Sequence, residues 1–312
     1  YPTAGPFDER HGYTKLPALL PRLTERGFVV RAQAEFSPAM QGFAAQGFFP
    51  PYREKVQSGL FLADCRNETI FDFNYPQRVY RQPQQIPLLV AHSLLFIENR
   101  NLLTIPPHAN PVMDWPRFVM AAVSQVGKVL AIGGQSAGGS TLATQIEKFR
   151  HSPMGLTQNF EDKAIQIISG TIRAYQHGPN TQAVRTRIVQ DYLNTVPLSS
   201  APGHGEVHGV GDALYAWFGT DFERANQLLS QPEQADTALE RARYFRQMLS
   251  LMIAQRRPSY YLLQGHADLE ELTDSHIRLL ANGGLIDQPL RDAALSQPLG
   301  YRDWVLEPNL QT

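Results

Sequence analysis

Apolar side chains recur at helical spacing through most of the chain after residue 86. Intervals of three, four and seven residues place side chains on one face of an α-helix. A further helix is expected over residues 269–282, closed by Gly283-Gly284. The other predicted helices are carried by these stripes: Phe118, Val119, Ala122, Val123, Val126, Val129 and Leu130; Leu142, Ile146 and Phe149; Ile165, Ile168, Ile172 and Tyr175; Val184, Ile188 and Tyr192; and Met248, Leu251 and Met252, which stop before Pro258.

The pattern before residue 86 is different. Residues 16–40 predict helix in part, broken by Pro17 and Pro21, and residues 47–59 form a connector rich in proline and glycine. Residues 59–74 then predict two short strands around a turn at Arg66-Asn67. The pattern therefore predicts a mainly α fold, a helical domain with a small N-terminal β-hairpin element.

Composition narrows the class of protein. The chain has 312 residues, of which 43% are apolar and 18% charged, so it is globular rather than disordered. The formal net charge of -1 provides no overall field for nucleic acid, so an anion site has to be a local cluster. Cys65 is the only cysteine, which excludes a disulfide framework within the chain.

The stretch LLFIENRN, residues 94–101, places Glu98 at the end of a strongly apolar run. A carboxylate that leaves an apolar wall is partly desolvated, which suits it to proton transfer. The alternative is a helix C-terminus emerging into water, with Glu98 as a solvated surface group. This stretch alone favours the alternative.

The segment GGQSAGGSTLATQIEKFR, residues 133–150, is the most informative one. A glycine-rich loop that runs into a helix N-terminus offers backbone N–H groups to a phosphate, and Ser140 or its neighbour is expected to cap the helix. Thr141, Gln145 and Lys148 then share the helix face opposite the apolar stripe. They are positioned either to hold a pyrophosphate or to form an ordinary polar outer face.

Two other segments carry polar residues at regular spacing. Lys163, Gln166, Gly170 and Arg173 lie opposite an isoleucine stripe, and Gly170 is interpreted as a point of helix–helix packing or of close ligand approach. Residues 204–219 hold His204, Glu206 and His208. They lack the HExxH spacing of a zinc site, so a flexible loop followed by a helix is the preferred interpretation.

These segments, taken in order, resemble a known family. GGSTLATQIEKF is similar to the GGSTxTQQLxKN motif of the peptidoglycan glycosyltransferases, the family-51 glycosyltransferases of bifunctional penicillin-binding proteins and their monofunctional relatives. The other matching segments are IENRN, DWPRFVMAAV, RIVQDYLNTVPL, GVGDALYAWFG, MLSLMIAQRRPSYYL and LLANGGLI. The resemblance implies a lysozyme-like helical domain over residues 59–294, after an N-terminal extension and connector (1–58) and before a C-terminal tail (295–312).

The resemblance also implies a reaction and its residues. The family joins lipid-linked disaccharide-peptide units into glycan strands with inversion. Glu98 matches the general base, and Gln166 stands where the family has a second catalytic glutamate. The residues expected to bind substrate are Ser140, Thr141, Gln145, Lys148, Lys163 and Arg173. No cofactor and no protein-bound metal is expected to be required, although a divalent metal, Mg²⁺ or Mn²⁺, can assist the departing pyrophosphate.

Departures from the family pattern leave alternatives open. Gln166 cannot ionise, Asp162 replaces an arginine, Asn99 replaces an aspartate, and Gln190 replaces the glutamate of the YLN segment. Glu147 and Glu161 are nearby acids that would substitute for the missing carboxylate. The chain is therefore either a transferase weakened by Gln166 or a non-catalytic domain that binds precursor or glycan. A lytic muramidase fits less well.

The implied partners are the lipid-linked peptidoglycan precursor, the growing glycan and the membrane, with no nucleic acid. The expected location is the cell envelope of a bacterium, at the periplasmic face of the inner membrane. An anchor upstream of Tyr1 is expected, because the polyprenyl substrate does not leave the bilayer easily. The longest apolar run, residues 86–97, is itself shorter than the roughly 20 residues that span a bilayer. Phe43, Phe48, Phe49 and Tyr52 are candidates for membrane contact.

Overall fold

The computed structural model describes residues 16–29, 37–49, 51, 58–113, 141–151, 160–232 and 234–303. The chain divides into two compact units. The first unit comprises Tyr1–Glu54 and Pro106–Gln182, and the second comprises Lys55–Ile105 and Ala183–Thr312. The helix predicted around residues 118–130 and most of the connector at 47–59 lie outside the described residues.

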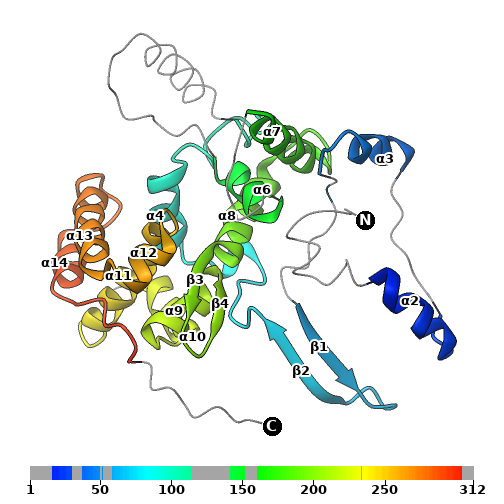
Figure 1. Ribbon diagram of the computed structural model, residues 1–312. Coiled ribbons are helices and arrows are strands. Elements are labelled where there is room, and N and C mark those ends of the chain that lie inside the picture. The colour runs from blue at the N-terminus through cyan, green and yellow to red at the C-terminus, as the bar shows by residue number, and fades with distance from the viewer. Residues whose placement is uncertain are drawn as a thin grey trace. The chain divides into compact units, whose positions relative to one another are not determined.

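Helices dominate the described residues, and the β structure found there consists of two short antiparallel hairpins (Figure 1). The prediction of a mainly α fold is confirmed. The elements are α2 (Leu16–Glu25), α3 (Pro38–Ala45), β1 (Ser58–Ala63), β2 (Thr69–Tyr75), η2 (Pro83–Gln85), α4 (Leu88–Glu98), α6 (Leu142–His151), α7 (Phe160–Tyr175), α8 (Gln182–Thr195), β3 (Pro197–Ala201), β4 (Gly205–His208), α9 (Gly209–Phe218), α10 (Phe222–Ser230), α11 (Ala238–Ala254), α12 (Pro258–Leu263), α13 (His266–Asn282) and α14 (Gln288–Leu295).

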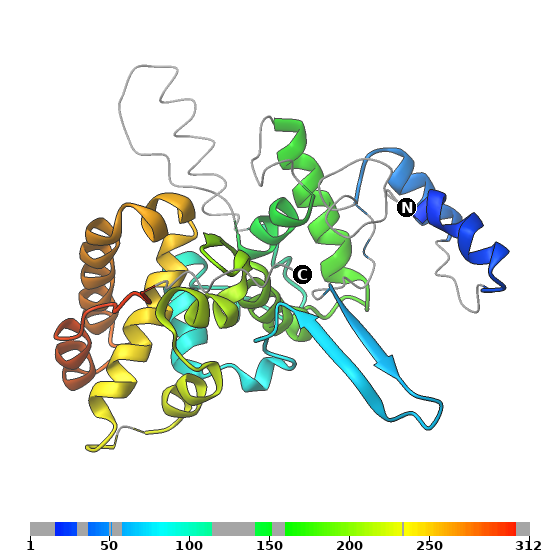
Figure 2. The same cartoon turned by 60° about the horizontal axis from the view of Figure 1, so that its bottom comes forward.

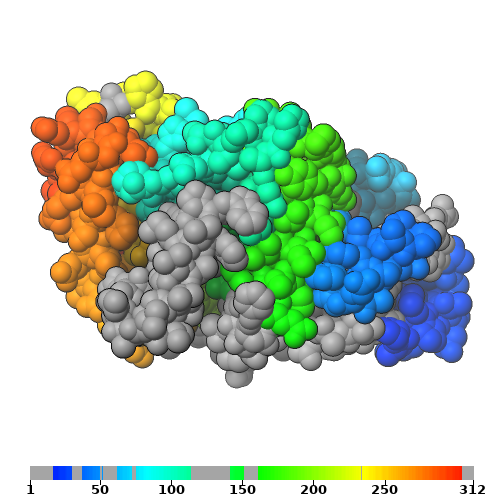
Figure 3. Space-filling model, turned by 90° about the horizontal axis from the view of Figure 1, so that it is seen from above, coloured from blue at the N-terminus to red at the C-terminus, as the bar shows by residue number. Residues whose placement is uncertain are grey.

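In the first unit, α6 packs on α7, and the segment after α3 runs along α7. The Phe49 backbone N–H donates to Ser169 Oγ at 2.9 Å, and Gln176 Nε2 donates to the Pro51 carbonyl at 3.0 Å. Figure 3 shows α3 beside α7 on one face. The helix α2 was expected to break at Pro21, but it continues through that residue.

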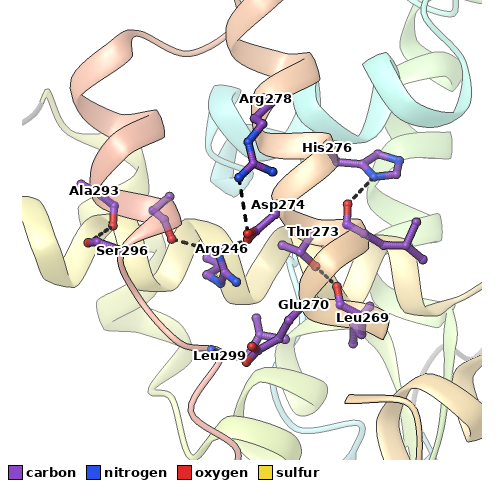
Figure 4. Close-up of polar contacts among 12 residues, drawn as sticks. Arg246, Leu269, Glu270, Thr273, Asp274, His276, Arg278, Ala293, Ser296 and Leu299 are labelled. Carbon is purple, nitrogen blue, oxygen red and sulfur yellow. Dashed lines mark hydrogen bonds and ion pairs between the residues drawn. The ribbon is translucent and has the colours of Figure 1, made fainter. Parts of the chain in front are cut away.

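In the second unit, α11 is the central helix, and α4, α9, α10, α13 and α14 pack around it. Its residues from Tyr244 to Ala254 are all buried, including Arg246, which is 3% exposed. The Arg246 guanidinium binds Asp274 of α13 and donates from Nη1 to the Ala294 carbonyl at 3.1 Å, while Arg278 approaches the same aspartate at 3.7 Å (Figure 4). A buried charge is tolerated where it is paired and hydrogen-bonded, so these contacts fix α13 and α14 on α11.

The predicted first hairpin is confirmed. Strands β1 and β2 run antiparallel, with Leu60 opposite Phe73 (Figure 2). The turn is closed by Asp64, whose Oδ1 accepts from the backbone N–H groups of Arg66 (2.8 Å) and Glu68 (2.9 Å). Asn67 has φ of 68°, in the left-handed region that asparagine tolerates better than most residues.

The second hairpin corrects an expectation. Residues 204–208 were predicted to be part of a flexible loop, but β3 and β4 pair antiparallel, with Pro197 opposite His208 and Ala201 opposite Gly205. The turn uses Gly203 and Gly205 at positive φ. The predicted helix after this segment is confirmed as α9, and Trp217 Nε1 of α9 donates to the Leu198 carbonyl of β3 at 3.1 Å.

The backbone of residues 77–80 is held by side chains from α8 and α9. Asp212 accepts from the N–H groups of Gln77 (2.9 Å) and Arg78 (3.0 Å). Asn194 accepts from the Tyr80 N–H at 2.9 Å, and Asn194 and Gln190 both donate to the Tyr80 carbonyl, at 2.8 and 2.7 Å. We call these three side chains the backbone clamp. Gln190 donates there through its amide, which an ionised glutamate cannot do.

Candidate functional site

Glu98 is the last helical residue of α4 in the second unit. The helix starts after Pro87 and buries Val90, Leu94 and Leu95 against the core, which carries its C-terminal end inward. The Glu98 side chain is only 11% exposed. The interpretation of this position as a helix C-terminus is right, but the description of Glu98 as a solvated surface group is wrong.

Two side chains from the turn between α11 and α12 reach the Glu98 carboxylate. Gln255 Nε2 donates to Glu98 Oε1 at 3.3 Å. Arg256 Nη2 lies 3.5 Å from the same oxygen, and the Arg256 side chain is 49% exposed. The carboxylate is therefore held by a neutral donor and a cation. The donor, Gln255, is separated from Glu98 by 157 residues of sequence.

Two titratable side chains from other helices also interact electrostatically with Glu98. Tyr192 of α8 is fully buried, and burial raises the pKa of its phenol well above the usual value; the charge of Glu98 adds to this and Arg256 opposes it. His276 of α13 has its pKa lowered by burial, so its ring is neutral near pH 7. Its Nδ1 is 2.7 Å from the Leu272 carbonyl, an acceptor that fixes the proton on Nδ1.

The end of α4 is also fixed by a close approach to α13. A Cβ added to Gly283 would lie 2.8 Å from Phe96 Cε2. Glycine at this position leaves room for the ring of Phe96, which lies two residues before the end of α4. The predicted closure of α13 at Gly283-Gly284 is confirmed, with Gly284 at φ of 71°.

In the first unit, Thr141 stands immediately before α6 and caps it. The Thr144 N–H donates to Thr141 Oγ1 at 3.3 Å, and the same hydroxyl donates to the Val112 carbonyl at 2.8 Å. The expectation that Ser140 or its neighbour caps this helix is thus confirmed through Thr141. Ser140 itself, and the glycine pairs before it, lie outside the described residues.

Lys148 on α6 and Lys163 on α7 form a pair of partly buried cations. Burial lowers the pKa of Lys148. Burial, followed by repulsion from Lys148, lowers the pKa of Lys163 to about 8. The Lys148 ammonium also lies 5.1 Å from the centre of the Phe149 ring, a cation–π contact at the position where the family motif has asparagine. Desolvated ammonium groups that repel each other bind an anion favourably.

A buried carboxylate organises two arginines at the α6–α7 interface. Glu147 Oε1 accepts from Arg173 Nε at 2.7 Å and from Arg150 Nη1 at 3.2 Å. The Glu147 side chain is 2% exposed. Arg173, a predicted substrate-binding residue, is therefore bound to a carboxylate of its own chain. Glu161, the other acid considered, lies exposed in the first turn of α7.

On α7 the polar stripe is partly buried and the apolar stripe is partly exposed. Gln166 is 1% exposed and faces inward, while Ile168, from the apolar stripe, is 39% exposed. A Cβ on Gly170 would lie 3.2 Å from Val112 Cγ1 and 3.5 Å from Glu147 Cγ. The interpretation of Gly170 as a point of close packing is confirmed. Gln145 on α6 is likewise buried, at 9% exposed, rather than on an outer polar face.

The histidine-rich segment does not assemble a metal site. His208 Nε2 lies 3.2 Å from Glu206 Oε2, a pair on one hairpin. Across the described ranges no group of three His, Cys, Asp or Glu side chains is placed to hold a metal ion. Glu147, the carboxylate next to Lys148 in the sequence, is bound to Arg150 and Arg173. The residues described therefore do not fit a bound divalent ion.

A sequence model of the transglycosylase family matches residues 66–280, more than half of the chain. The chain belongs to the transglycosylase family. A search of curated proteins finds no match. The transglycosylase is thus a peptidoglycan glycosyltransferase in the general sense, with a lysozyme-like fold and a role in the cell envelope. None of its described helices has the length and apolar character needed to cross a membrane.

The transglycosylase divides its predicted site residues between the two units. Glu98 lies in the second unit, whereas Thr141, Gln145, Lys148, Lys163, Gln166 and Arg173 lie in the first. Sequence reasoning missed Gln255 and Arg256, although they stand in the quoted segment MLSLMIAQRRPSYYL. The only available signal was their place two and three residues before Pro258, near which a helix tends to end.

The depressed pKa of Lys163 predicts a pH dependence for anion binding by the transglycosylase. Lys163 loses its proton near pH 8, whereas lysine ordinarily does so near 10.5, so the affinity for inorganic pyrophosphate should fall as the pH rises through about 8. Binding at that pH should take up protons, because the anion stabilises the ammonium form. Titration calorimetry between about pH 7 and 9.5, in two buffers of different ionisation enthalpy, measures both effects.

The matched variant for this experiment is Lys163→Arg, which stays charged over the whole range and should flatten the pH dependence. A wild-type affinity that is constant up to about pH 9.5 would contradict the prediction.

The lowered pKa of Lys163 also has a consequence for the stability of the fold. The unfolded chain binds more protons than the folded one between about pH 8 and 10.5, so this group makes the protein more stable as the pH rises through that window.

Proposed function

We propose that this transglycosylase polymerises lipid-linked disaccharide-peptide, lipid II, into glycan strands, and that Glu98 is its general base. The observation that carries the proposal is the placement of Glu98, a largely buried carboxylate at the end of an apolar helix, bound by Gln255 and Arg256. A base needs a fixed orientation and a protonation state matched to the operating pH. The contacts of Glu98 with Gln255 and Arg256 favour a fixed orientation of its carboxylate.

In the proposed reaction, Glu98 takes the proton from the 4-hydroxyl of the acceptor sugar. That oxygen attacks the anomeric carbon of the donor from the face opposite the pyrophosphate, and the bond from the anomeric carbon to the pyrophosphate oxygen breaks. The configuration therefore inverts. The electron pair of the broken bond leaves with the polyprenyl pyrophosphate, so negative charge grows on the leaving group.

Lys148 and Lys163 are proposed to bind that pyrophosphate. Their lowered pKa values reflect a site in which positive charge is poorly solvated, and an anion relieves this cost. Ser140, Thr141 and Gln145 are proposed to add hydrogen bonds through hydroxyl, backbone and amide groups. The role of Arg173 is proposed to be indirect, because its Nε is bound to Glu147. No step of the scheme is assigned to a metal.

The proposal places the protein at the periplasmic face of the inner membrane, because the donor carries a polyprenyl chain that stays in the bilayer. Phe43, Phe48 and Phe49 remain candidates for this contact. The rings of Phe43 and Phe48 stack with their centres 4.5 Å apart, and all three side chains are partly exposed. Tyr52 lies outside the described residues.

A second candidate is a domain that binds precursor or glycan without catalysis, and Gln166 favours it. The family has a carboxylate at this position, whereas Gln166 is a buried amide that cannot ionise. Loss of one of two catalytic carboxylates slows a reaction without abolishing the binding of its substrate. The two candidates therefore differ in turnover rather than in affinity.

The deciding experiment supplies purified protein with lipid-linked disaccharide-pentapeptide, with and without a divalent metal, and follows glycan chain length on a gel. Wild type is expected to polymerise slowly. Gln166→Glu should match or exceed wild type, because Lys163, one turn earlier on α7, is a cation that can balance the added charge. Binding without extension would support the second candidate, and soluble muropeptides released from finished wall would indicate a lytic enzyme instead.

A further inference from the structure

We infer that Arg256 and Gln255 are positioning residues for Glu98, which fix the orientation of its carboxylate. The inference rests on the proposed role of Glu98 as a base. Both side chains reach the same oxygen, Oε1, at 3.5 Å and 3.3 Å. Two donors on one oxygen restrain the rotation of the carboxylate about its last bond.

The turn that carries these residues is rigidly built. Its preceding residues, Ile253 and Ala254, are fully buried at the end of α11. The N–H groups of Arg256 and Arg257 donate to the carbonyls of Ile253 (3.3 Å) and Ala254 (3.0 Å). Pro258 then opens α12 as its first residue. The positions of Gln255 and Arg256 are therefore set by the central helix of the second unit rather than by a loose loop.

Arg256 is the cation that the described contacts place at the Glu98 carboxylate. Among the described residues, Tyr192 of α8 and His276 of α13 also interact electrostatically with Glu98, and both are neutral near pH 7 because burial raises the pKa of Tyr192 and lowers that of His276. Arg100, from the turn after α4, stacks its guanidinium on the Phe96 ring, 3.9 Å from the ring centre. Arg256 is permanently charged and is placed at the carboxylate itself.

The neighbouring residue, Arg257, provides a matched control. It has the same charge and belongs to the same turn, but its guanidinium lies over the Tyr260 ring, 4.4 Å from the ring centre. The pair between Arg256 and Glu98 is half exposed on the arginine side, and pairs of this kind contribute little to folding. Arg256→Gln should therefore fold normally and report on function.

The first test measures kcat and KM for glycan polymerisation. Arg256→Gln is expected to lower kcat about tenfold with little change in KM, because the base loses part of its fixed orientation. Arg256→Lys should restore part of the lost kcat. Gln255→Leu should also lower kcat with little change in KM, since it removes the other donor to Glu98 Oε1. Arg257→Gln should match wild type.

The second test does not depend on activity. The carboxyl carbon of Glu98 is followed by ¹³C NMR at a fixed pH of about 7, with Glu98→Gln used to assign the signal. Its chemical shift should change in Arg256→Gln, which removes a contact to Oε1, and stay in place in Arg257→Gln. A chemical shift and a kcat that are unchanged in Arg256→Gln, or an equal effect of Arg257→Gln, would overturn the inference. An inactive wild type that still shows the NMR change would overturn the proposed base role and leave the positioning contact established.

Discussion

Replacing Glu98 with glutamine is expected to lower the rate of glycan polymerisation by about 10² to 10⁴-fold, the range that general bases contribute. Glutamine has nearly the shape of glutamate and can still accept a hydrogen bond from Gln255, so the end of α4 should keep its structure. The amide cannot take a proton from the acceptor hydroxyl. The loss should appear in kcat, with KM for the lipid-linked substrate changed much less.

The measurement is the gel assay of glycan chain length, combined with circular dichroism to verify that the variant is folded. Glu271→Gln is the matched control, because it makes the same chemical change at an exposed position of α13 in the same unit. It should retain wild-type activity. Polymerisation that survives Glu98→Gln at more than about a tenth of the wild-type rate would remove the assignment of Glu98 as the base.

Replacing Glu147 with alanine is expected to lower the free energy of unfolding by about 3–5 kcal/mol, the usual cost of removing one partner from a buried ion pair. Glu147 Oε1 binds both Arg150 and Arg173, whose side chains are 6% and 20% exposed. Both arginines would lose the carboxylate that links α6 to α7. Substitution of the carboxylate by a methyl group also leaves a gap beside Gly170, whose close approach to Glu147 depends on the present packing.

Urea unfolding followed by circular dichroism measures this loss. Glu161→Ala is the control, since Glu161 is an exposed acid in the first turn of α7 and contributes at most about 1 kcal/mol through the helix dipole. Similar unfolding curves for the two variants would show that the buried ion pairs are not a major source of stability. A large loss of stability in Glu147→Ala alone would explain why this chain has a glutamate at position 147, where the family motif does not require one.

The helices with regular apolar stripes were predictable from sequence, because periodicity reflects burial on one face of a helix. α8 buries Ile188 and Tyr192 as expected, and α11 buries Met248 and Leu251. The spacing does not say which face of α7 lies inward, because the polar contacts that allow Gln166 to be buried form only when the unit folds. Ile168 is left exposed there, against the general tendency of apolar side chains.

The second hairpin and the partners of Glu98 were beyond sequence reasoning for a different physical reason. β3 and β4 are five and four residues long and include Ser199 at φ of 68°, so their pairing is too short and irregular to produce an alternating pattern. Gln255 contacts Glu98 across 157 residues, and no local spacing records such a contact. The fold of each unit was therefore more predictable than the surroundings of its polar side chains.

The backbone clamp of Gln190, Asn194 and Asp212 has a consequence for how related sequences should vary. These side chains bind main-chain atoms of residues 77–80, which every amino acid except proline presents in the same way. Substitutions within residues 77–80 that keep the backbone path therefore leave the clamp intact. The clamp residues themselves have no such freedom, since their amides and carboxylate are the binding groups. Evolutionary drift in this segment should therefore accumulate at the exposed Gln77 and spare the three side chains that hold its backbone.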